Sequence, residues 1–505
     1  MIFGTSHQQQ QHRLAICIYS TNAAQTLRAV EIAKAIEHIV DQGDQIDKTI
    51  LRFFTYRGSL TEEVDSEKRV DYEHVIRRAG FEIEYFGKLP GEEGNHDASA
   101  LPSDDNQNQY AAAVLDDEMW SAFLRAEKDH LGIFPPPHDV RATPYLRAII
   151  ETLSEFHPDV VLYGLFPEVA VASKIKGWNT VAFGPLPMYC DDWMKKHLYV
   201  TSNVSEASPQ KSKTAIVHNP YAVLESAAKE CGLTTPFSNF GDVLRPNRTI
   251  VCDFECFYED HELPSDVSVV GPVISTSSDS ILNNSGDERQ LPREVEQFLY
   301  SDDSKAHCED DMNNQIRVFL TMGSTGDLNH FCEAFHAIYN ANPGTFKAII
   351  SIPANLLVSD ELNSSLSSDR NEKKNDVLIL KGFVPALAIM KHVDVVLSHG
   401  GQSSIQSAFA AGVPIVATPN QAEQRFNLRN VEKCHAGVCI PREEWREDAI
   451  REALLRVGGG TRYKVAALGM KEKFEEGKDA LTRAAEIVLN ELYRNLGLNA
   501  ESSDP

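Results

Sequence analysis

The sequence predicts an α/β protein of two domains, each built around a parallel sheet. The chain has 505 residues, which is too long for one hydrophobic core. Strand patterns alternate with amphipathic helix patterns through both halves, as in proteins with parallel sheets. In the second half, a buried strand runs directly into a glycine turn and an apolar helix, which is the unit from which such sheets are built.

The composition is that of an ordinary globular protein, with 42% hydrophobic and 8% aromatic residues. The 48 basic and 73 acidic residues give a net charge of −25, which argues against a surface for nucleic acid or anionic membrane. No stretch is long and apolar enough to cross a bilayer, and the short run Leu14–Tyr19 is typical of a first strand rather than of a signal segment. We therefore expect no nucleic-acid partner and no transmembrane segment; the sequence indicates no oligomeric state.

The nine cysteines are scattered without CxxC spacing, and their neighbours are apolar or helical. This pattern favours reduced thiols in the core of a cytoplasmic protein. No group of residues has the spacing of metal ligands, so we expect no bound metal.

The first domain is predicted to span residues 13–274, after a polar tail of residues 1–12. Its first strand, Leu14–Tyr19, precedes a helix whose apolar residues recur at helical spacing to Ile36 and beyond. Further strands are expected at 49–56, 81–86, 158–163, 180–183, 249–252 and 267–274, and helices at 72–78, 145–156 and 167–176.

Two segments have the composition of irregular structure. Residues 189–240 include Asp191 and Asp192 among aromatic side chains, and loops in such a place commonly form the pocket for a variable substrate. Residues 275–314 are rich in serine, asparagine and acidic residues apart from a short helix at 291–300, so they are predicted to link the domains.

The second domain is predicted to span residues 315–478. Strands are expected at 317–322, 346–352, 377–380, 393–397 and 415–417, and helices at 329–339, 445–457 and 464–493. The last helical stretch, about residues 479–497, is expected to pack back on the first domain.

Two strands of this domain end in glycine turns, Gly323-Ser324 and His399-Gly400-Gly401, and a helix follows each turn. Glycines allow a ligand to approach the backbone closely, and the unpaired N–H groups at a helix start favour an anion. The spacing therefore predicts a phosphate-binding edge of the sheet.

Residues 316–440 resemble the nucleotide-sugar-dependent glycosyltransferases of family 1, which includes plant and antibiotic-tailoring enzymes. The resemblance implies the GT-B fold, in which two Rossmann-like domains face each other across a cleft. The matching pieces are Gly323-Ser324, Phe383-Val384-Pro385, His399-Gly400-Gly401, Ser404, Gly412-Val413-Pro414, Glu423-Gln424, Asn427 and Gly437.

Carried over residue by residue, the resemblance implies a donor site. His399 would bind the donor diphosphate together with the amides that follow it, and hydroxyl groups would assist. Phe383 would stack on the nucleobase and Val384 would read it through its backbone, while Glu423 and Gln424 would hydrogen-bond the sugar hydroxyls. The remaining diphosphate-binding residues are Gly323, Ser324, Gly400, Gly401, Ser403 and Ser404.

Three positions depart from the family pattern. Gln25 stands where the family has its acceptor-activating histidine, and glutamine cannot act as a general base. Gly164 stands about where the family has the aspartate that orients this histidine, and Ser407 where it has a ribose-binding glutamate. The acceptor could need little deprotonation, since positioning alone accelerates the reaction. Another base could serve, such as Asp191, Asp192 or a histidine of the insertions, or the protein could be inactive.

The resemblance implies an inverting transferase that moves a hexose from a nucleotide diphosphate sugar, UDP-linked, to a small and largely apolar acceptor such as a natural product. The donor is a co-substrate, so no cofactor is expected. Gln25 and Ser407 motivate an alternative, a non-catalytic protein of the same fold that senses nucleotide sugars or serves as a scaffold subunit. A sugar-nucleotide epimerase of the same fold is a third hypothesis, but the Glu423-Gln424 pair resembles the motif of transferases more closely than that of epimerases.

Overall fold

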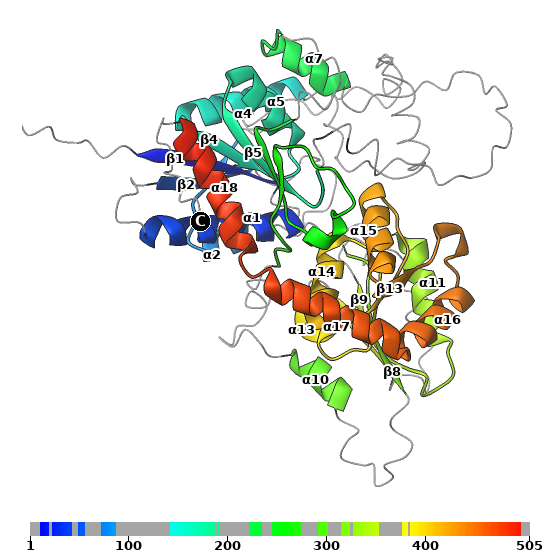
Figure 1. Cartoon of the computed structure of the whole chain (residues 1–505). Coiled ribbons are helices and arrows are strands. Elements are labelled where there is room, and N and C mark those ends of the chain that lie inside the picture. The colour runs from blue at the N-terminus through cyan, green and yellow to red at the C-terminus, as the bar shows by residue number, and fades with distance from the viewer. Residues whose placement is uncertain are drawn as a thin grey trace, which may run out of the picture.

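The computed structural model describes the greater part of both predicted domains. The residues described are 11–19, 23–42, 49–55, 72–86, 142–187, 190, 193, 222–234, 245–274, 291–300, 315–323, 327–352, 376–381 and 384–495. They form two lobes, each with its own parallel sheet (Figure 1).

The first lobe contains a seven-stranded sheet with the order β3-β2-β1-β4-β5-β6-β7, and the strand pairs are parallel throughout. The apolar residues of β1 and β4 are fully buried, as expected for central strands covered on both faces. The strands are β1 (His12–Cys17), β2 (Thr49–Thr55), β3 (Ile83–Tyr85), β4 (Val160–Tyr163), β5 (Asn179–Gly184), β6 (Arg248–Val251) and β7 (Val267–Val269).

Helices cover both faces of this sheet. The first face packs on α1 (Ala23–Gln42) and α2 (Glu73–Arg78), with Val30 and Ile36 of α1 fully buried. The opposite face packs on α4 (Ala142–Phe156), α5 (Pro167–Lys176) and α7 (Ala222–Glu230), and a single 3₁₀ turn, η5 (Glu255–Phe257), follows β6.

The second lobe contains a six-stranded parallel sheet with the order β10-β9-β8-β11-β12-β13. Its strands are β8 (Ile316–Thr321), β9 (Phe346–Ile352), β10 (Val377–Lys381), β11 (Val395–Ser398), β12 (Ile415–Ala417) and β13 (Gly437–Cys439). Its helices are α11 (Leu328–Tyr339), α13 (Ala386–Met390), α14 (Gln402–Ala411), α15 (Ala422–Lys433), α16 (Glu447–Gly458) and α17 (Thr461–Glu476), with η9 (Arg442–Glu444) before α16 and α10 (Arg293–Tyr300) before β8.

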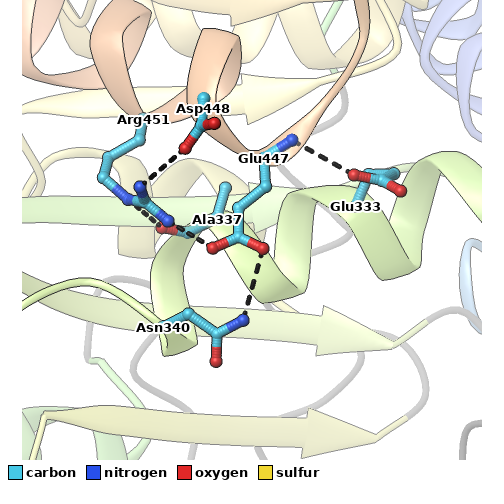
Figure 2. A network of polar contacts seen from close by, with 6 residues as sticks. All are labelled: Glu333, Ala337, Asn340, Glu447, Asp448 and Arg451. Atoms are coloured by element: carbon cyan, nitrogen blue, oxygen red, sulfur yellow. Dashed lines mark hydrogen bonds and ion pairs between the residues drawn. The ribbon is translucent and has the colours of Figure 1, made fainter.

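A polar network fastens α16 to α11 on the outside of this sheet (Figure 2). The backbone N–H of Glu447 donates to the Glu333 carboxylate at 3.1 Å, and Asn340 Nδ2 donates to Glu447 Oε2 at 3.3 Å. Arg451 donates to Asp448 at 3.0 Å and to the carbonyl of Ala337 at 3.4 Å, and it also bonds to Glu447. These contacts are partly exposed, so they fix the position of α16 more than they stabilise the fold.

The C-terminal helix α18 (Ala480–Asn495) runs back to the first lobe and packs on α1 (Figure 1). Its apolar face buries Ala484, Val488 and Leu492 in the core of that lobe. The stretch 464–493, predicted as one helix, is thus two helices, because α17 ends at its C-cap Gly477 and α18 begins at Ala480. Within the described residues, no helix is long and apolar enough to span a membrane.

The predicted α/β class with two Rossmann-like sheets is confirmed, and the prediction of wholly irregular structure at 189–240 was wrong. The helix α7 lies within that segment, where the sequence Ala222–Glu230 is rich in alanine and other good helix formers. Leu224, Ala227 and Ala228 are buried against the first lobe, so packing adds to the helix propensity of these residues in stabilising α7. The predicted last strand of this lobe is also shorter than expected, ending at Val269.

Candidate functional site

The glycine turns of the second domain meet at one edge of its sheet. In the register of the strands, Ser398 of β11 lies opposite Thr321 of β8 and Ala417 of β12. Because parallel strands end at the same edge, Gly323 and His399 lie next to each other immediately beyond β8 and β11.

The His399 ring is held between two glycines. A Cβ atom built on Gly323 would lie 2.7 Å from His399 Cε1, and one built on Gly401 would lie 2.6 Å from His399 Nε2. Gly323 has φ of 58° and Gly400 has φ of 83°, which side chains other than glycine rarely adopt. The glycines of both turns therefore make room for the imidazole as well as for the bends of the chain.

His399 is neutral at physiological pH. Its side chain is buried, and this burial lowers its pKa from 6.5 to about 4. Nδ1 has no hydrogen-bond partner among the described residues. A neutral imidazole with an unsatisfied nitrogen suits a polar ligand that enters this turn.

The helix α14 begins directly beyond this imidazole. Gly401 is its N-cap and supplies no side-chain hydrogen bond, while Gly412 ends it in the left-handed conformation. Ser403 is exposed and Ser404 half-buried at the start of the helix, whereas Ile405 is buried in the core. The helix start thus carries two hydroxyl groups beside the turn, while its Gln402 amide donates to Glu423 and its Ser404 amide donates to the Gly401 carbonyl.

Glu423, on the neighbouring helix α15, reaches the same helix start. Its Oε1 accepts the backbone N–H of Gln402 at 3.2 Å and Asn427 Nδ2 at 2.5 Å. Asn427 Nδ2 also donates to the Gly400 carbonyl at 3.1 Å, so one amide joins the glycine turn to the glutamate. Burial raises the pKa of Glu423 to about 7, and the charge of Asp253 adds to this effect.

Gln424 has a structural contact that the sequence did not indicate. Its Oε1 accepts the backbone N–H groups of Asn420 at 2.7 Å and Gln421 at 3.2 Å, forming a capping box at the start of α15. The side chain of Gln424 is buried. The amide oxygen that the family pattern aims at the sugar is therefore engaged in the helix cap in this state.

Gln402 connects the helix start to the first domain. Arg28 of α1 donates to Gln402 Oε1 at 2.6 Å. Gln402 Nε2 in turn donates to the carbonyls of Pro185 at 3.2 Å and Cys252 at 3.0 Å, which follow β5 and β6. All three contacts cross between the domains, so the carboxyl edges of the two sheets face each other at α14.

A buried carboxylate lies beside this contact. Asp253 Oδ1 accepts Gln406 Nε2 of α14 at 3.2 Å and the backbone N–H of Phe254 at 2.9 Å. Its Oδ2 has no hydrogen-bond partner among the described residues. Burial raises the pKa of Asp253 to about 6, so this group titrates close to physiological pH.

The departures in the first domain lie together. Gln25 is buried on α1, and a Cβ atom built on Gly164 would lie 2.6 Å from Gln25 Oε1 and 3.2 Å from Phe183 Cζ. The glutamine amide therefore fills the space that a side chain at position 164 would need. The two positions at which the sequence departs from the family pattern are therefore in direct contact.

A second buried carboxylate lies at the same edge of the first sheet. Glu168, in the first turn of α5, accepts a hydrogen bond from the Tyr19 hydroxyl at 2.7 Å, and the Tyr19 ring stacks on Phe166 with centroids 4.1 Å apart. Burial raises the pKa of the Glu168 carboxyl. Sequence patterns did not indicate Glu168, Asp253, Gln402 or Arg28; an acidic residue in the loop or first helical turn after a buried strand is the signal that could have found Asp253 and Glu168.

Several predicted site residues lie outside the residues that the structure describes. These are Asp191, Asp192, Ser324 and Phe383. Val384 is half-buried at the start of α13, and Ser407 is half-buried on α14. Within the described residues, no group of three or more His, Cys, Asp or Glu side chains could hold a metal ion.

Comparison with known proteins places the sequence similarity in the second domain. Residues 360–485 match the family described as erythromycin biosynthesis protein CIII-like, C-terminal domain. The NDP-glycosyltransferase YjiC of Bacillus subtilis (strain 168) is 33% identical over 104 residues, which cover 21% of this chain and 26% of that protein. The chain is thus matched over about a quarter of the length of this relative.

Two solved structures share the whole architecture. The glycotransferase of kitacinnamycin has a TM-score of 0.58 at 16% identity and covers 96% of this chain and 99% of its own. The glycosyltransferase VinC in complex with DTDP has a TM-score of 0.56 at 14% identity and covers 94% of this chain and 100% of its own. The chain therefore has the GT-B fold, and in its C-terminal domain it resembles the family 1 type of nucleotide-sugar-dependent glycosyltransferases.

Proposed function

We propose that this protein is a glycosyltransferase that moves a hexose from a nucleotide diphosphate sugar to a small, largely apolar acceptor of the natural-product class. The observation that carries the proposal is the neutral, buried His399 between Gly323 and Gly401 at the start of α14. A departing diphosphate needs hydrogen-bond donors already in place, and the Ser403 and Ser404 hydroxyl groups beside the imidazole would supply them.

The contact between the domains supports transfer rather than binding alone. Arg28 in the second turn of α1 contacts Gln402 at the start of α14, one turn away from Gln25 and beside the His399 turn. An acceptor held by the first domain would therefore lie next to a donor held by the second. Such positioning is a major part of catalysis in a two-substrate reaction.

Two donor nucleotides, uridine and thymidine diphosphates, are considered for the proposed reaction. We propose a UDP-sugar from the family resemblance, while VinC, of similar fold, has been solved in complex with DTDP. We further propose that the reaction inverts the anomeric centre and that the donor is a co-substrate with no cofactor or metal. We place the activity in the cytoplasm, because all the cysteines among the described residues are free thiols.

The test is calorimetric titration of the full chain with UDP- and dTDP-hexoses, followed by incubation with apolar hydroxylated acceptors and chromatography of the products. We expect micromolar binding of at least one donor, transfer that persists in EDTA, and a product of inverted anomeric configuration by NMR. As a control for substitutions in the second domain, Gly469→Ala on α17 should bind donor like the wild-type protein, because a Cβ atom there meets nothing within 4 Å. Absence of binding to every donor would overturn the proposal.

A second candidate function is a non-catalytic sensor of nucleotide sugars, and it is favoured by one observation. Gln25, at the position where the family pattern has its base, lies against Gly164, so no acidic side chain at position 164 adjoins it. Donor binding without hydrolysis or transfer to any acceptor would support the sensor. Turnover that survives Gln25→Ala would instead support an enzyme whose base lies elsewhere.

A further inference from the structure

A second contact between the domains lies away from the donor turn, where α15 meets the segment after β6. The Phe426 ring of α15 lies with its centroid 5.4 Å from Tyr258 and 5.6 Å from His261. Beyond these rings, Lys433 at the end of α15 forms an ion pair with Asp260. We call this contact, between residues 254–261 and α15 with Cys434, the α15 junction.

The α15 junction contains one cysteine from each domain. Cys256 belongs to η5, and Cys434 is the C-cap of α15, next to Lys433. The two thiols lie close enough to influence each other, and both are partly accessible to solvent. The Tyr258–Phe426 contact and the Asp260–Lys433 ion pair hold the two segments that carry these cysteines against each other.

The charges around this pair favour a thiolate on Cys434. The interaction with Cys256 lowers the pKa of Cys434, and the positive charges of Lys473 and Lys433 lower it further. The same interaction and burial raise the pKa of Cys256. Since the thiolate is the nucleophile in disulfide exchange, Cys434 has the character of an attacking cysteine and Cys256 that of its resolving partner.

Other cysteines of the chain lack this character. Cys17 and Cys252 are fully buried, and burial raises the pKa of each thiol. Cys439, five residues after Cys434, has its pKa raised to about 12 by burial. Cys434 thus contrasts with these three thiols.

We propose that Cys256 and Cys434 form a reversible disulfide that fastens the two domains together at the α15 junction. The oxidant is an organic disulfide of the glutathione class. The Cys434 thiolate attacks one of its sulfurs, forming a mixed disulfide and releasing one thiolate. The Cys256 thiol then loses its proton and attacks Cys434 Sγ, which releases the second thiolate and leaves the protein disulfide.

This proposal does not depend on the proposed transferase function, because bond formation is measured directly. The full chain is equilibrated with a mixture of oxidised and reduced glutathione, alkylated, digested with trypsin and analysed by mass spectrometry. Trypsin leaves Cys256 in the peptide 249–289 with Cys252, and Cys434 in the peptide 434–442 with Cys439. The expected product is these two peptides joined, lighter by two hydrogens than their sum, and separated again by dithiothreitol.

Variants within the same two peptides identify the sulfurs. Cys256→Ser and Cys434→Ser should abolish the joined peptide, whereas Cys252→Ser and Cys439→Ser should retain it. In the unmodified reduced protein, Cys434 should alkylate at least tenfold faster at pH 7 than Cys439. The proposal would be overturned if Cys434 of the wild-type chain gained only glutathione and no joined peptide formed. This measurement uses the wild-type protein, so it does not depend on the folding of any variant.

Discussion

The turn around His399 and the region around Gln25 occupy corresponding places at the edges of the two sheets, and they differ in what the chain has kept. In the second domain, Gly323 and Gly401 enclose an imidazole that a Cβ atom at either position would displace. In the first domain, Gln25 fills the space above Gly164, where the family has an acid. In the proposed transferase, donor recognition and acceptor activation would therefore be physically separable, because each would rest on its own sheet.

The largest expected effect is on donor binding, which should depend on the turn around His399. The contrast between the two regions would be wrong if donor binding did not need this turn. His399→Ala and Gly401→Ala should each weaken donor binding or kcat/KM by about 10²–10³-fold, because the first removes the imidazole and the second places a Cβ atom 2.6 Å from it. Donor titration measures the effect. Gly469→Ala, whose added methyl group lies in open space, should bind donor like the wild-type protein.

The first half can be tested for a replacement base. Glu168 lies at the sheet edge beside Tyr19, and its carboxyl is buried, so we expect Glu168→Gln to lower kcat by about 10²-fold where acceptor deprotonation limits the rate. Asp253→Asn should lower kcat less, because Asp253 Oδ1 is engaged by Phe254 and Gln406. The pH profile of kcat is the measurement.

A base role at Glu168 has a distinct signature. Because burial raises the pKa of this carboxyl, kcat of the wild-type enzyme should increase with pH across an acidic limb, and Glu168→Gln should remove that limb. A profile that keeps the limb, with activity lowered evenly at every pH, would assign Glu168 a structural role. A limb that disappears instead in Asp253→Asn would move the assignment to Asp253.

The sequence predicted the donor half in more detail than the acceptor half, for a physical reason. The strand, glycine turn and helix around His399 are contiguous, and their boundaries follow from local glycine and hydrophobic patterns. The contacts of Gln402 with Arg28, Pro185 and Cys252 join residues 150 or more positions apart, so no local sequence pattern indicates them. Capping by Gln424 was missed because the same residue also fits a ligand motif.

The pairing of Gln25 with Gly164 predicts a coupling energy. Gly164→Ala should destabilise the protein by about 1–3 kcal/mol, since its Cβ atom would lie 2.6 Å from Gln25 Oε1. Gln25→Ala removes that atom, so Gly164→Ala should cost less by about 1 kcal/mol in the Gln25→Ala background. Urea unfolding of the four proteins measures the cycle. Additive effects would show that the two positions do not share the space.

The smallest expected effect concerns the Glu423 carboxyl group, which accepts the Gln402 amide at the helix start beside the His399 turn, and it depends on pH. Burial raises the pKa of Glu423 from 4.5 to about 7, so the folded protein holds this proton more tightly than the unfolded chain. The stability from this proton is present below about pH 4.5 and lost as pH rises through 7.

Glu423→Gln keeps a side chain that can accept the Gln402 amide without the charge. We expect the variant to gain on the order of 1 kcal/mol over wild type at pH 8 and nothing at pH 5, as measured by urea unfolding at both pH values. An equal difference at the two pH values would mean that Glu423 is already charged in the folded protein at pH 5, and the donor turn would then carry a fixed negative charge opposite the phosphates it is proposed to bind.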